Sequence, residues 1–380
     1  MMKMTRSKST ADKNKRMTIA IDCRHLHNSG IGVYLRGCLP YFLETEHDFL
    51  LFGDSAHIAE AAGGARGNVD IAECRVKPFS LNELFCFPRP LLKKINRAGV
   101  YYSPFFNVPG GITIPVCATI HDIIFPDMPE LTSRTGLFAR MRFFKRAAKR
   151  AAKIFTVSQF SKSRIEHYLG TSKPIVVAPG GIQSAFASYR AGPVLREKNQ
   201  TIVFIGNIKK HKGLDCLLEA FIAARAEGLP HQLIIIGSRD NFRTADDSFL
   251  KKIDSSVSGA VTFTGALSDA ALIDHVARAS LLVQPSLYEG FGFPPLEAMF
   301  LGTRALVSDI PVFKEIYGGF PVVFFKAGDS GSLKEKLMEL LYNAHTDCGT
   351  EFAGLSDELK NKYTFEKTAG IILDEIREFL

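Results

Sequence analysis

One pattern runs through the whole chain: short apolar runs bounded by turn residues alternate with longer amphipathic stretches. This alternation is typical of β-α units, in which strands form a parallel sheet and helices cover it. In the first half the predicted strands are Met17–Ile21, Phe49–Phe52, Gly99–Tyr102, Pro115–Ile120, Lys153–Val157 and Pro174–Ala178. In the second half they are Thr201–Ile205, Gln232–Ile236, Val261–Phe263, Leu281–Gln284, Arg304–Ser308 and Val322–Phe324. We therefore expect an α/β protein.

A polar connector around Arg190–Gln200 separates the two sets of strands. Six strands on each side predict two doubly wound, Rossmann-like domains that face each other across a cleft at the carboxyl ends of their strands. A chain of 380 residues agrees, because single domains typically hold about 150 residues. We expect a disordered basic tail (1–16), an N-terminal domain (17–192), a C-terminal domain (193–362) and a helix (363–380). The apolar stripe of that helix does not itself identify its partner, and packing back on the N-terminal domain is the expectation.

The net charge of +8 is unevenly distributed. Residues 1–195 hold 27 Lys+Arg against 14 Asp+Glu, or +13, whereas residues 196–380 hold 20 against 25, or −5. A basic first half indicates an anionic partner: a phosphate-bearing ligand, an anionic membrane surface or nucleic acid. The seven cysteines include no C-x-x-C pair, which favours free thiols over a disulfide framework or a zinc site. Because neither a signal peptide nor a membrane-spanning run is visible, we expect a cytoplasmic protein.

The stretch 285–299 follows an apolar strand and precedes an apolar-periodic run, so it predicts a strand, a glycine loop and a helix. Gly290 and Gly292 would let the backbone approach a ligand closely, and the helix N-terminus would offer N–H groups to an anion. Glu289 and Glu297 flank this loop, where two carboxylates can bind several hydroxyls, as on a sugar and a ribose. The alternative is structural: Glu297 complements the helix dipole and Glu289 is a solvated loop residue.

This E-x7-E segment resembles the signature of the retaining glycosyltransferases of family 4, which have the GT-B fold. Further segments resemble the same family in the right order. They are Asp22–Tyr34 with its glycines, Thr119–Asp122, Thr156–Lys162 and Phe204–Gly213. The resemblance covers roughly residues 17–330. GT-B is the two-domain architecture that the strand pattern predicts.

For the donor diphosphate, the resemblance implies one set of ligands from each domain. Lys212 would bind diphosphate oxygens, with Lys209 as second choice, and the N–H groups of Gly30 and Gly32 would approach them from the other domain. Asn207 stands where many relatives have arginine, so one of the usual cations is missing or replaced by Lys209. Solvated lysines and a tight turn without a ligand are the structural alternatives.

The resemblance implies that the glycine loop and the helix after it bind the donor sugar and the ribose. Glu289 would hold sugar hydroxyls near the N–H groups of Phe291 and Gly292, with Gly290 allowing close approach. Glu297 would hold the ribose.

His121 and Asp122 would act beside the donor sugar, His121 by contact and Asp122 by orienting it, although a hydrogen-bonded structural role is the alternative for the histidine. The residues expected to carry catalysis are Glu289, His121, Asp122 and Lys212. No general base is assigned, because donor phosphate oxygen can itself accept the acceptor's proton. Neither a metal nor another cofactor is expected, since the chain lacks the Asp-x-Asp metal bridge of the other large glycosyltransferase fold.

The implied reaction moves a hexosyl group from a nucleotide-diphosphate sugar to a lipid-linked or polysaccharide acceptor in cell-surface glycan synthesis. The Ile-His-Asp and Gly-Ile-Gly-x-Tyr segments resemble mannosyltransferases, so GDP-mannose is the first candidate donor and a UDP-hexose the second. A dinucleotide-binding oxidoreductase is a rival, but the chain lacks G-x-G-x-x-G with an acid about 20 residues on. A non-catalytic membrane-binding protein is another rival. Nucleic-acid binding is not expected, because no helix-turn-helix or zinc pattern occurs and the second half is acidic.

The tract Leu131–Ile165 holds ten Lys+Arg and no acidic residue. Its apolar side chains fall on one helical stripe, and most cations lie off that stripe. The tract is either an ordinary helix with a basic solvent face or a surface for anionic headgroups or a lipid-pyrophosphate acceptor. The residues predicted for that surface are Arg140, Arg142, Lys145, Arg146, Lys149, Arg150 and Lys153. The protein would then be peripheral on the inner face of the cytoplasmic membrane.

Overall fold

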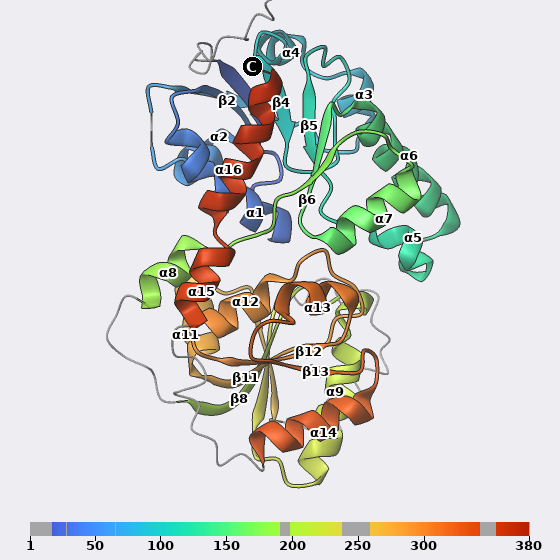
Figure 1. Cartoon of the computed structure of the whole chain (residues 1–380), viewed down its shortest axis with the longest axis vertical. Coiled ribbons are helices and arrows are strands. Elements are labelled where there is room, and N and C mark those ends of the chain that lie inside the picture. Colours follow the sequence, from blue (N-terminus) through green and yellow to red (C-terminus); the bar gives the residue numbers. More distant parts are fainter. Residues whose placement is uncertain are drawn as a thin grey trace, which may run out of the picture.

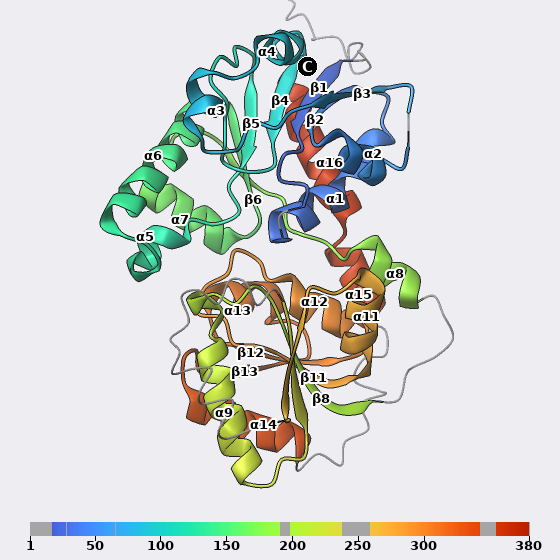
Figure 2. The ribbon, with the colours of Figure 1, turned by 180° about the vertical axis from the view of Figure 1, so that it is seen from behind.

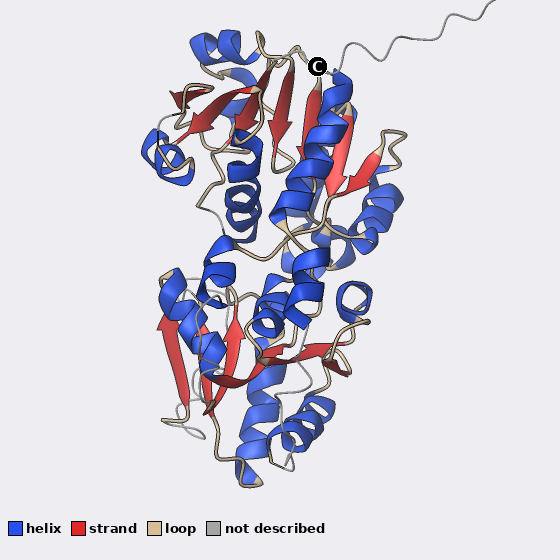
Figure 3. Cartoon of the chain, turned by 60° about the vertical axis from the view of Figure 1, so that its left-hand side comes forward, coloured by secondary structure: helices blue, strands red, loops and turns tan. Residues whose placement is uncertain are grey.

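The computed structural model describes residues 17–27, 29–64, 66–190, 198–237, 259–342 and 355–379. The expected tail, residues 1–16, lies outside the described residues. The described chain forms one 7-stranded and one 6-stranded sheet, both with parallel pairing. Figure 1 shows the two sheets in separate halves of the molecule, and Figure 3 shows helices on both faces of each sheet. The predicted architecture of two doubly wound α/β domains is confirmed.

The first sheet has the strand order β3-β2-β1-β4-β5-β6-β7. Its strands are β1 (Thr18–Asp22), β2 (Asp48–Gly53), β3 (Val69–Glu73), β4 (Val100–Ser103), β5 (Val116–Thr119), β6 (Lys153–Thr156) and β7 (Ile175–Val177). The accompanying helices are α1 (Ser29–Leu43), α2 (Ser55–Ala61), α3 (Leu81–Phe85), α4 (Arg89–Ile95), α5 (Ile124–Asp127), η1 (Pro129–Leu131), α6 (Arg134–Arg150), α7 (Gln159–Leu169) and α8 (Ser184–Arg190). The central strands are buried on both faces, which is why they appear as continuous apolar runs.

The second sheet has the strand order β10-β9-β8-β11-β12-β13. Its strands are β8 (Asn199–Ile205), β9 (Gln232–Ile236), β10 (Val261–Gly265), β11 (Ala279–Gln284), β12 (Arg304–Ser308) and β13 (Val322–Phe325). The accompanying helices are η2 (Lys210–Lys212), α9 (Leu214–Ala226), α11 (Asp269–Arg278), α12 (Phe293–Phe300), α13 (Pro311–Tyr317), α14 (Ser330–Leu341) and α15 (Leu355–Lys362). All twelve predicted runs coincide with strands.

One described strand, β3, was not predicted. It pairs with β2 at the edge of the first sheet, and none of its residues is fully buried. Its sequence, VDIAE, is interrupted by two acidic residues and does not form a continuous apolar run. An edge strand that is solvated on one side gives this weaker signal.

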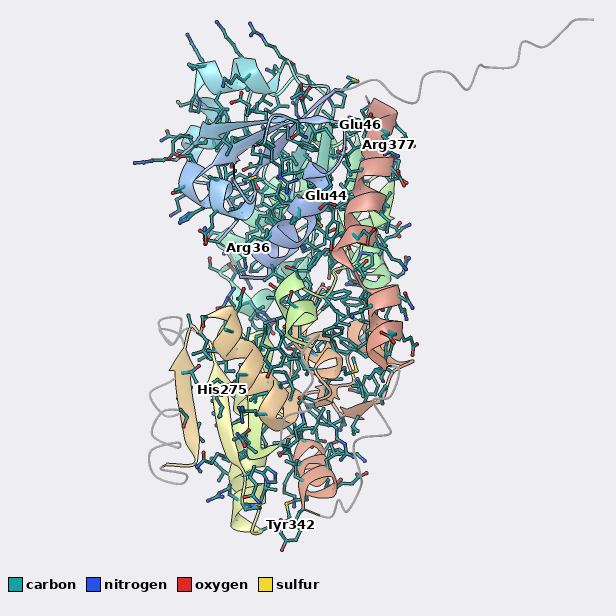
Figure 4. The ribbon with its side chains drawn as sticks, turned by 90° about the vertical axis from the view of Figure 1, so that its left-hand side faces the viewer. Arg36, Glu44, Glu46, His275, Tyr342 and Arg377 are labelled. Atoms are coloured by element: carbon teal, nitrogen blue, oxygen red, sulfur yellow. The ribbon has the colours of Figure 1, made fainter. Side chains whose placement is uncertain are left out.

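The chain crosses back to the first sheet at its C-terminal end, where α16 (Phe365–Ile376) and η4 (Arg377–Phe379) follow α15. Figure 1 shows α16 running along the first domain, against α1. A Cβ on Gly37 of α1 would lie 2.3 Å from the Phe365 ring, so glycine permits this close packing. Figure 4 shows Arg377 beside the segment after α1 that carries Glu46. The first domain is thus completed by the last described residues.

Candidate active site

Glu289 accepts several hydrogen bonds in the loop that follows β11. Its Oε1 accepts from Lys212 Nζ at 2.6 Å and from Ser286 Oγ at 2.7 Å, and Gln284 Nε2 lies 3.4 Å away. Burial alone would raise the pKa of Glu289, but the charge and hydrogen bond of Lys212 hold this pKa below its ordinary value. The site therefore contains an ionised carboxylate beside an ammonium group.

Two loops at the carboxyl ends of neighbouring strands bring this pair together. Lys212 belongs to η2, which follows β8, and Glu289 follows β11. Gly213 ends η2 with φ +69°, and a Cβ there would lie 1.9 Å from Pro285 O. Because a side chain would collide with that carbonyl, Gly213 lets the two loops meet and sets the position of Lys212.

Gly290, the next residue, lies against the first domain. A Cβ on Gly290 would be 2.7 Å from His121 O and 3.3 Å from Asp122 Cβ. Ser158 Oγ, before α7, donates to Gly290 O at 2.7 Å. The structure therefore brings together the predicted residues Glu289, Gly290, His121 and Asp122 at the junction of the two domains.

His121 is held in one neutral form. Its Nε2 lies 2.8 Å from Pro104 O, and a carbonyl can only accept, so Nε2 carries the proton. Loss of solvent around the ring lowers the pKa of His121 to about 4, despite the hydrogen bond to Pro104. The Tyr34 ring lies nearly perpendicular to the imidazole, at a centroid distance of 4.9 Å. At neutral pH His121 thus keeps Nδ1 free of a proton and able to accept one hydrogen bond.

Asp122 lies close to the Glu289 and Lys212 charges. Desolvation raises the pKa of Asp122, and the nearby Glu289 carboxylate raises it further. The N–H of Ile124 donates to Asp122 Oδ1 at 3.2 Å, which orients the carboxyl group at the start of α5. Two carboxyl groups from opposite domains therefore face the same region, one of them next to a lysine.

Glu297, which the resemblance implies as a ribose ligand, is a buried residue of the helix that follows the glycine loop. It lies within α12, is buried, and its Oε1 accepts from Gln183 Nε2 at 2.7 Å. Burial raises the pKa of Glu297 to about 7. Gln183 precedes α8, in the segment that joins the domains, so Glu297 contacts the interdomain crossover.

The remaining residues of the glycine loop form the start of α12. Phe291 is buried, and its ring packs against Phe293 and Tyr363 at centroid distances of 5.3 and 5.6 Å. Gly292 has φ +89°, and a Cβ there would lie 2.5 Å from the Phe313 ring. The Phe291 side chain is therefore part of the core, and only the backbone of these two residues can serve a ligand.

Gly30 and Gly32 lie in the first turn of α1, after β1, and differ in what surrounds them. A Cβ on Gly32 would be 2.3 Å from Leu26 O, so packing alone requires glycine there. Gly30 is exposed, and a Cβ on it would meet no atom within 4 Å. Packing therefore does not require glycine at position 30, in contrast to position 32.

Lys209 and Asn207 stand between β8 and η2. Lys209 is exposed and Asn207 is half-buried. Coulomb effects of both Lys209 and Lys212 reach Asp122, which places these cations on the side of the second domain that faces the first. Lys209 and Asn207 were both predicted to bind the donor, and of the two only Lys209 is placed near Asp122 by its charge.

A buried ionic network in the first domain was not predicted. Arg24 NH2 lies 2.5 Å from Asp22 Oδ2 and 2.6 Å from Glu83 Oε1. Asn107 Nδ2 donates to the same two carboxylates, at 3.0 and 3.1 Å, and Asn107 Oδ1 lies 3.2 Å from His25 Nε2. The network ties the loops after β1 and β4 to α3. The only sequence signal was a pair of charges at the end of an apolar strand.

The structure corrects part of the basic surface that was predicted for anionic headgroups or a lipid-pyrophosphate acceptor. Lys153 begins β6 and is buried, and its Nζ pairs with Glu375 and with Glu378, the latter at 2.8 Å. It therefore holds the C-terminal segment and is not a surface cation. Arg146 and Arg150 donate to backbone carbonyls of residues 108–112, so they also brace a loop. The predicted cations that remain exposed are Arg140, Arg142, Lys145, Lys149 and the outer part of Arg150.

Within the described residues, no group of three His, Cys, Asp or Glu side chains is arranged to hold a metal ion. Across the same ranges, no helix has both the length and the apolar character needed to cross a membrane.

Comparisons with known proteins identify glycosyltransferase sequences along most of the chain. A family model described as "Glycosyltransferase Family 4" matches residues 29–186, and one described as "Glycosyl transferases group 1" matches residues 186–349. The O-antigen chain mannosyltransferase RfbU of Salmonella typhimurium is 29% identical over 200 residues, which is 52% of this chain and 53% of RfbU. A GDP-mannose:cellobiosyl-diphosphopolyprenol alpha-mannosyltransferase of Komagataeibacter xylinus is 26% identical over 167 residues, 44% of this chain and 41% of that protein.

These alignments span about half the length of the curated relatives. Among solved structures, Anabaena HepE in complex with UDP and glucose matches with a TM-score of 0.69 and 17% identity, over 96% of this chain and 100% of that chain. Matched from residue 29 to residue 349 and folded as two parallel-sheet domains, the chain belongs to glycosyltransferase family 4 and has the GT-B fold.

Proposed function

We propose that this protein is a retaining glycosyltransferase that moves a hexosyl group, first of all mannose from GDP-mannose, to a lipid-linked or polysaccharide acceptor. The observation that carries the proposal is the Lys212 and Glu289 pair, joined at 2.6 Å and facing His121 and Asp122 of the other domain. The pair lies where α/β domains bind ligands, at the carboxyl ends of parallel strands.

The leaving group of such a reaction is a nucleoside diphosphate, so the main task is to stabilise negative charge that develops on it. Lys212 can exchange its hydrogen bond to Glu289 for one to a phosphate oxygen, and the exposed Lys209 can add a second cation. From the first domain, the N–H groups at the start of α1 can donate to the same anion. These groups supply the charge without a metal, so we expect transfer to proceed in the presence of EDTA.

The carboxylates and the histidine would position the sugar. Once Lys212 turns to phosphate, the ionised Glu289 can accept hydrogen bonds from sugar hydroxyls, held in place by Ser286. Neutral His121 offers Nδ1 as an acceptor, and Asp122 borders the same space. Glu297 would accept from the ribose through Oε2, while its Oε1 keeps the hydrogen bond from Gln183. Donor phosphate oxygen would accept the acceptor's proton.

The choice of mannose rests on the two relatives described above, both of which are named as mannosyltransferases. The test is turnover of purified protein with GDP-mannose, UDP-glucose, UDP-galactose and UDP-N-acetylglucosamine, using a polyprenyl-diphosphate oligosaccharide or polysaccharide as acceptor. We expect release of GDP well above buffer hydrolysis with GDP-mannose only. Turnover of a UDP-sugar alone would replace mannose by the second candidate. Titration with NAD(H) that gave binding while every nucleotide sugar failed would favour the rival oxidoreductase.

We further propose that the acceptor is reached at an anionic membrane surface. Three of the four large apolar side chains that are exposed in the described chain lie on α3 and α6: Leu81, Phe85 and Phe138. Figures 1 and 2 show both helices along the same side of the first domain. The exposed cations of α6 lie beside them, and apolar insertion plus basic charge is the combination that binds anionic bilayers.

Liposome co-sedimentation tests this second proposal. The two double variants are Phe85→Ser/Phe138→Ser and Arg142→Glu/Lys145→Glu, and the control is Lys334→Glu in the second domain. Each is compared with the wild type on vesicles with and without anionic lipid. We expect both double variants to lose binding to anionic vesicles and the control to keep it. Unchanged sedimentation of the double variants would remove the membrane from the proposed function.

A further inference from the structure

The N-terminus of α7, in the first domain, is bound by the second domain at two places. Ser158 caps the helix by accepting from Ser161 N at 3.0 Å, and the same hydroxyl donates to Gly290 O at 2.7 Å. Glu315 of α13 accepts from Gln159 N and from Phe160 N, each at 2.7 Å. One helix end therefore carries hydrogen bonds both to the glycine loop and to a neighbouring helix of the second domain.

These contacts differ in their access to water. Ser158 is fully buried, whereas Glu315 is exposed. The first N–H groups of any helix have no acceptor within the helix, and a carboxylate is stabilised by the positive end of the helix dipole. Two charge-assisted hydrogen bonds at one carboxylate are stronger than neutral ones, yet at an exposed position water can replace them. Glu315 thus suits a contact that forms and breaks.

The Ser158 contact acts on the residue next to Glu289. The Gly290 peptide is fixed on one side by the Ser158 hydroxyl and on the other by the backbone of His121, which leaves no room for a Cβ. Its orientation therefore depends on the first domain being in place. If the domains separate, both constraints on this peptide are lost together.

From these contacts we propose that Ser158 and Glu315 are positioning residues: Glu315 latches the two domains through the α7 N-terminus, and Ser158 then sets the glycine loop that carries Glu289. Neither touches the reacting atoms. The catalytic consequence rests on the proposed function, because it assumes that Glu289 binds donor sugar. The latch itself does not, and it can be measured without any substrate.

Hydrogen exchange tests the latch directly. The amides of Gln159 and Phe160 should be protected in the wild-type protein and should exchange at least about tenfold faster in Glu315→Ala, because the loss of a charged acceptor returns them to water. Glu335→Ala removes an equally exposed glutamate from α14 and should leave their exchange unchanged. Equal exchange of these amides in wild type and Glu315→Ala would overturn the latch.

The catalytic part has its own readout, the ratio of donor hydrolysis to transfer measured with GDP-mannose, or with whichever nucleotide sugar the panel selects. In Glu315→Ala and Ser158→Ala we expect kcat for transfer to fall about tenfold while hydrolysis falls less, so that the ratio rises. Ser133→Ala removes the equivalent cap of α6, where the hydroxyl accepts from Gly136 N, and should not change the ratio.

A fall in transfer and hydrolysis by the same factor would refute positioning and leave only a stabilising role. If no nucleotide sugar is used by the wild-type protein, the proposed function fails, while the exchange experiment still decides the latch.

Discussion

The two domains order the loops at their facing edges in different ways. In the first domain Arg24 is sealed between Asp22 and Glu83, and all three side chains are at most 2% exposed. In the second domain, the Lys212 and Glu289 side chains are 21% and 10% exposed. There the loops are positioned by close backbone contacts at glycines, and not by buried ion pairs. A sealed ion pair cannot exchange partners with a ligand, whereas a partly exposed one can. The first network therefore builds the scaffold, and the second pair is the one for which we propose a role in chemistry.

The largest expected effect is on stability, in the sealed network. Arg24→Met leaves two buried carboxylates without their cation, which should lower the free energy of unfolding by about 3 to 5 kcal/mol. Arg75→Met removes a surface partner of Glu73 and should leave the urea midpoint unchanged. Equal midpoints for Arg24→Met and the wild type would contradict the assignment of this network to the scaffold.

The next effect is on turnover, in the partly exposed pair. Glu289→Gln keeps the shape but removes the charge that balances Lys212 and that we propose binds sugar hydroxyls, so it should lower kcat about 100-fold or more. Its urea midpoint should stay close to that of the wild type. Glu335→Gln is the matched surface control. A Glu289→Gln variant that kept full turnover would show that the pair is also scaffold.

Glu297 gives a smaller effect that depends on pH. Because its folded pKa is about 7 and its unfolded pKa about 4.5, the native state binds more protons between these values. The stabilisation that this proton uptake gives the native state is fully present below pH 4.5 and is lost as pH rises through 7. Glu297→Gln has no such loss. Between pH 5 and pH 8 its free energy of unfolding should therefore rise relative to that of the wild type by up to about 3 kcal/mol. A constant difference between the two unfolding free energies would contradict the raised pKa.

The smallest effect separates buried from exposed cations within the first domain. Lys153→Met removes the ion pairs to Glu375 and Glu378 and should lower stability by about 1 to 2 kcal/mol, with faster hydrogen exchange in α16. Arg142→Met, at an exposed position of α6, should change neither quantity. Identical exchange in α16 for both variants would refute the role of Lys153 in holding the C-terminal segment.

The same contrast explains how far the sequence predicts this protein. Continuous apolar strands are local patterns, and they predicted twelve strands. The family resemblance, carried by short local motifs, implied that Glu289 lies near Lys212, His121 and Asp122. Lys153 was wrongly predicted as surface because its partner Glu375 lies 222 residues away in the chain. The Arg24 network and the Glu315 contact were missed for the same reason, since long-range pairing of single charges has no local periodicity.

Titration with GDP, free of acceptor and of turnover, tests the central claim most directly. It compares the wild-type protein with Lys212→Ala and with Lys210→Ala, whose side chain is exposed on the same short helix. If Lys212 binds the diphosphate, its loss should weaken GDP binding by about tenfold or more, and Lys210→Ala should match the wild type. Equal affinity of all three proteins for GDP, and likewise for UDP, would contradict a diphosphate site at Lys212.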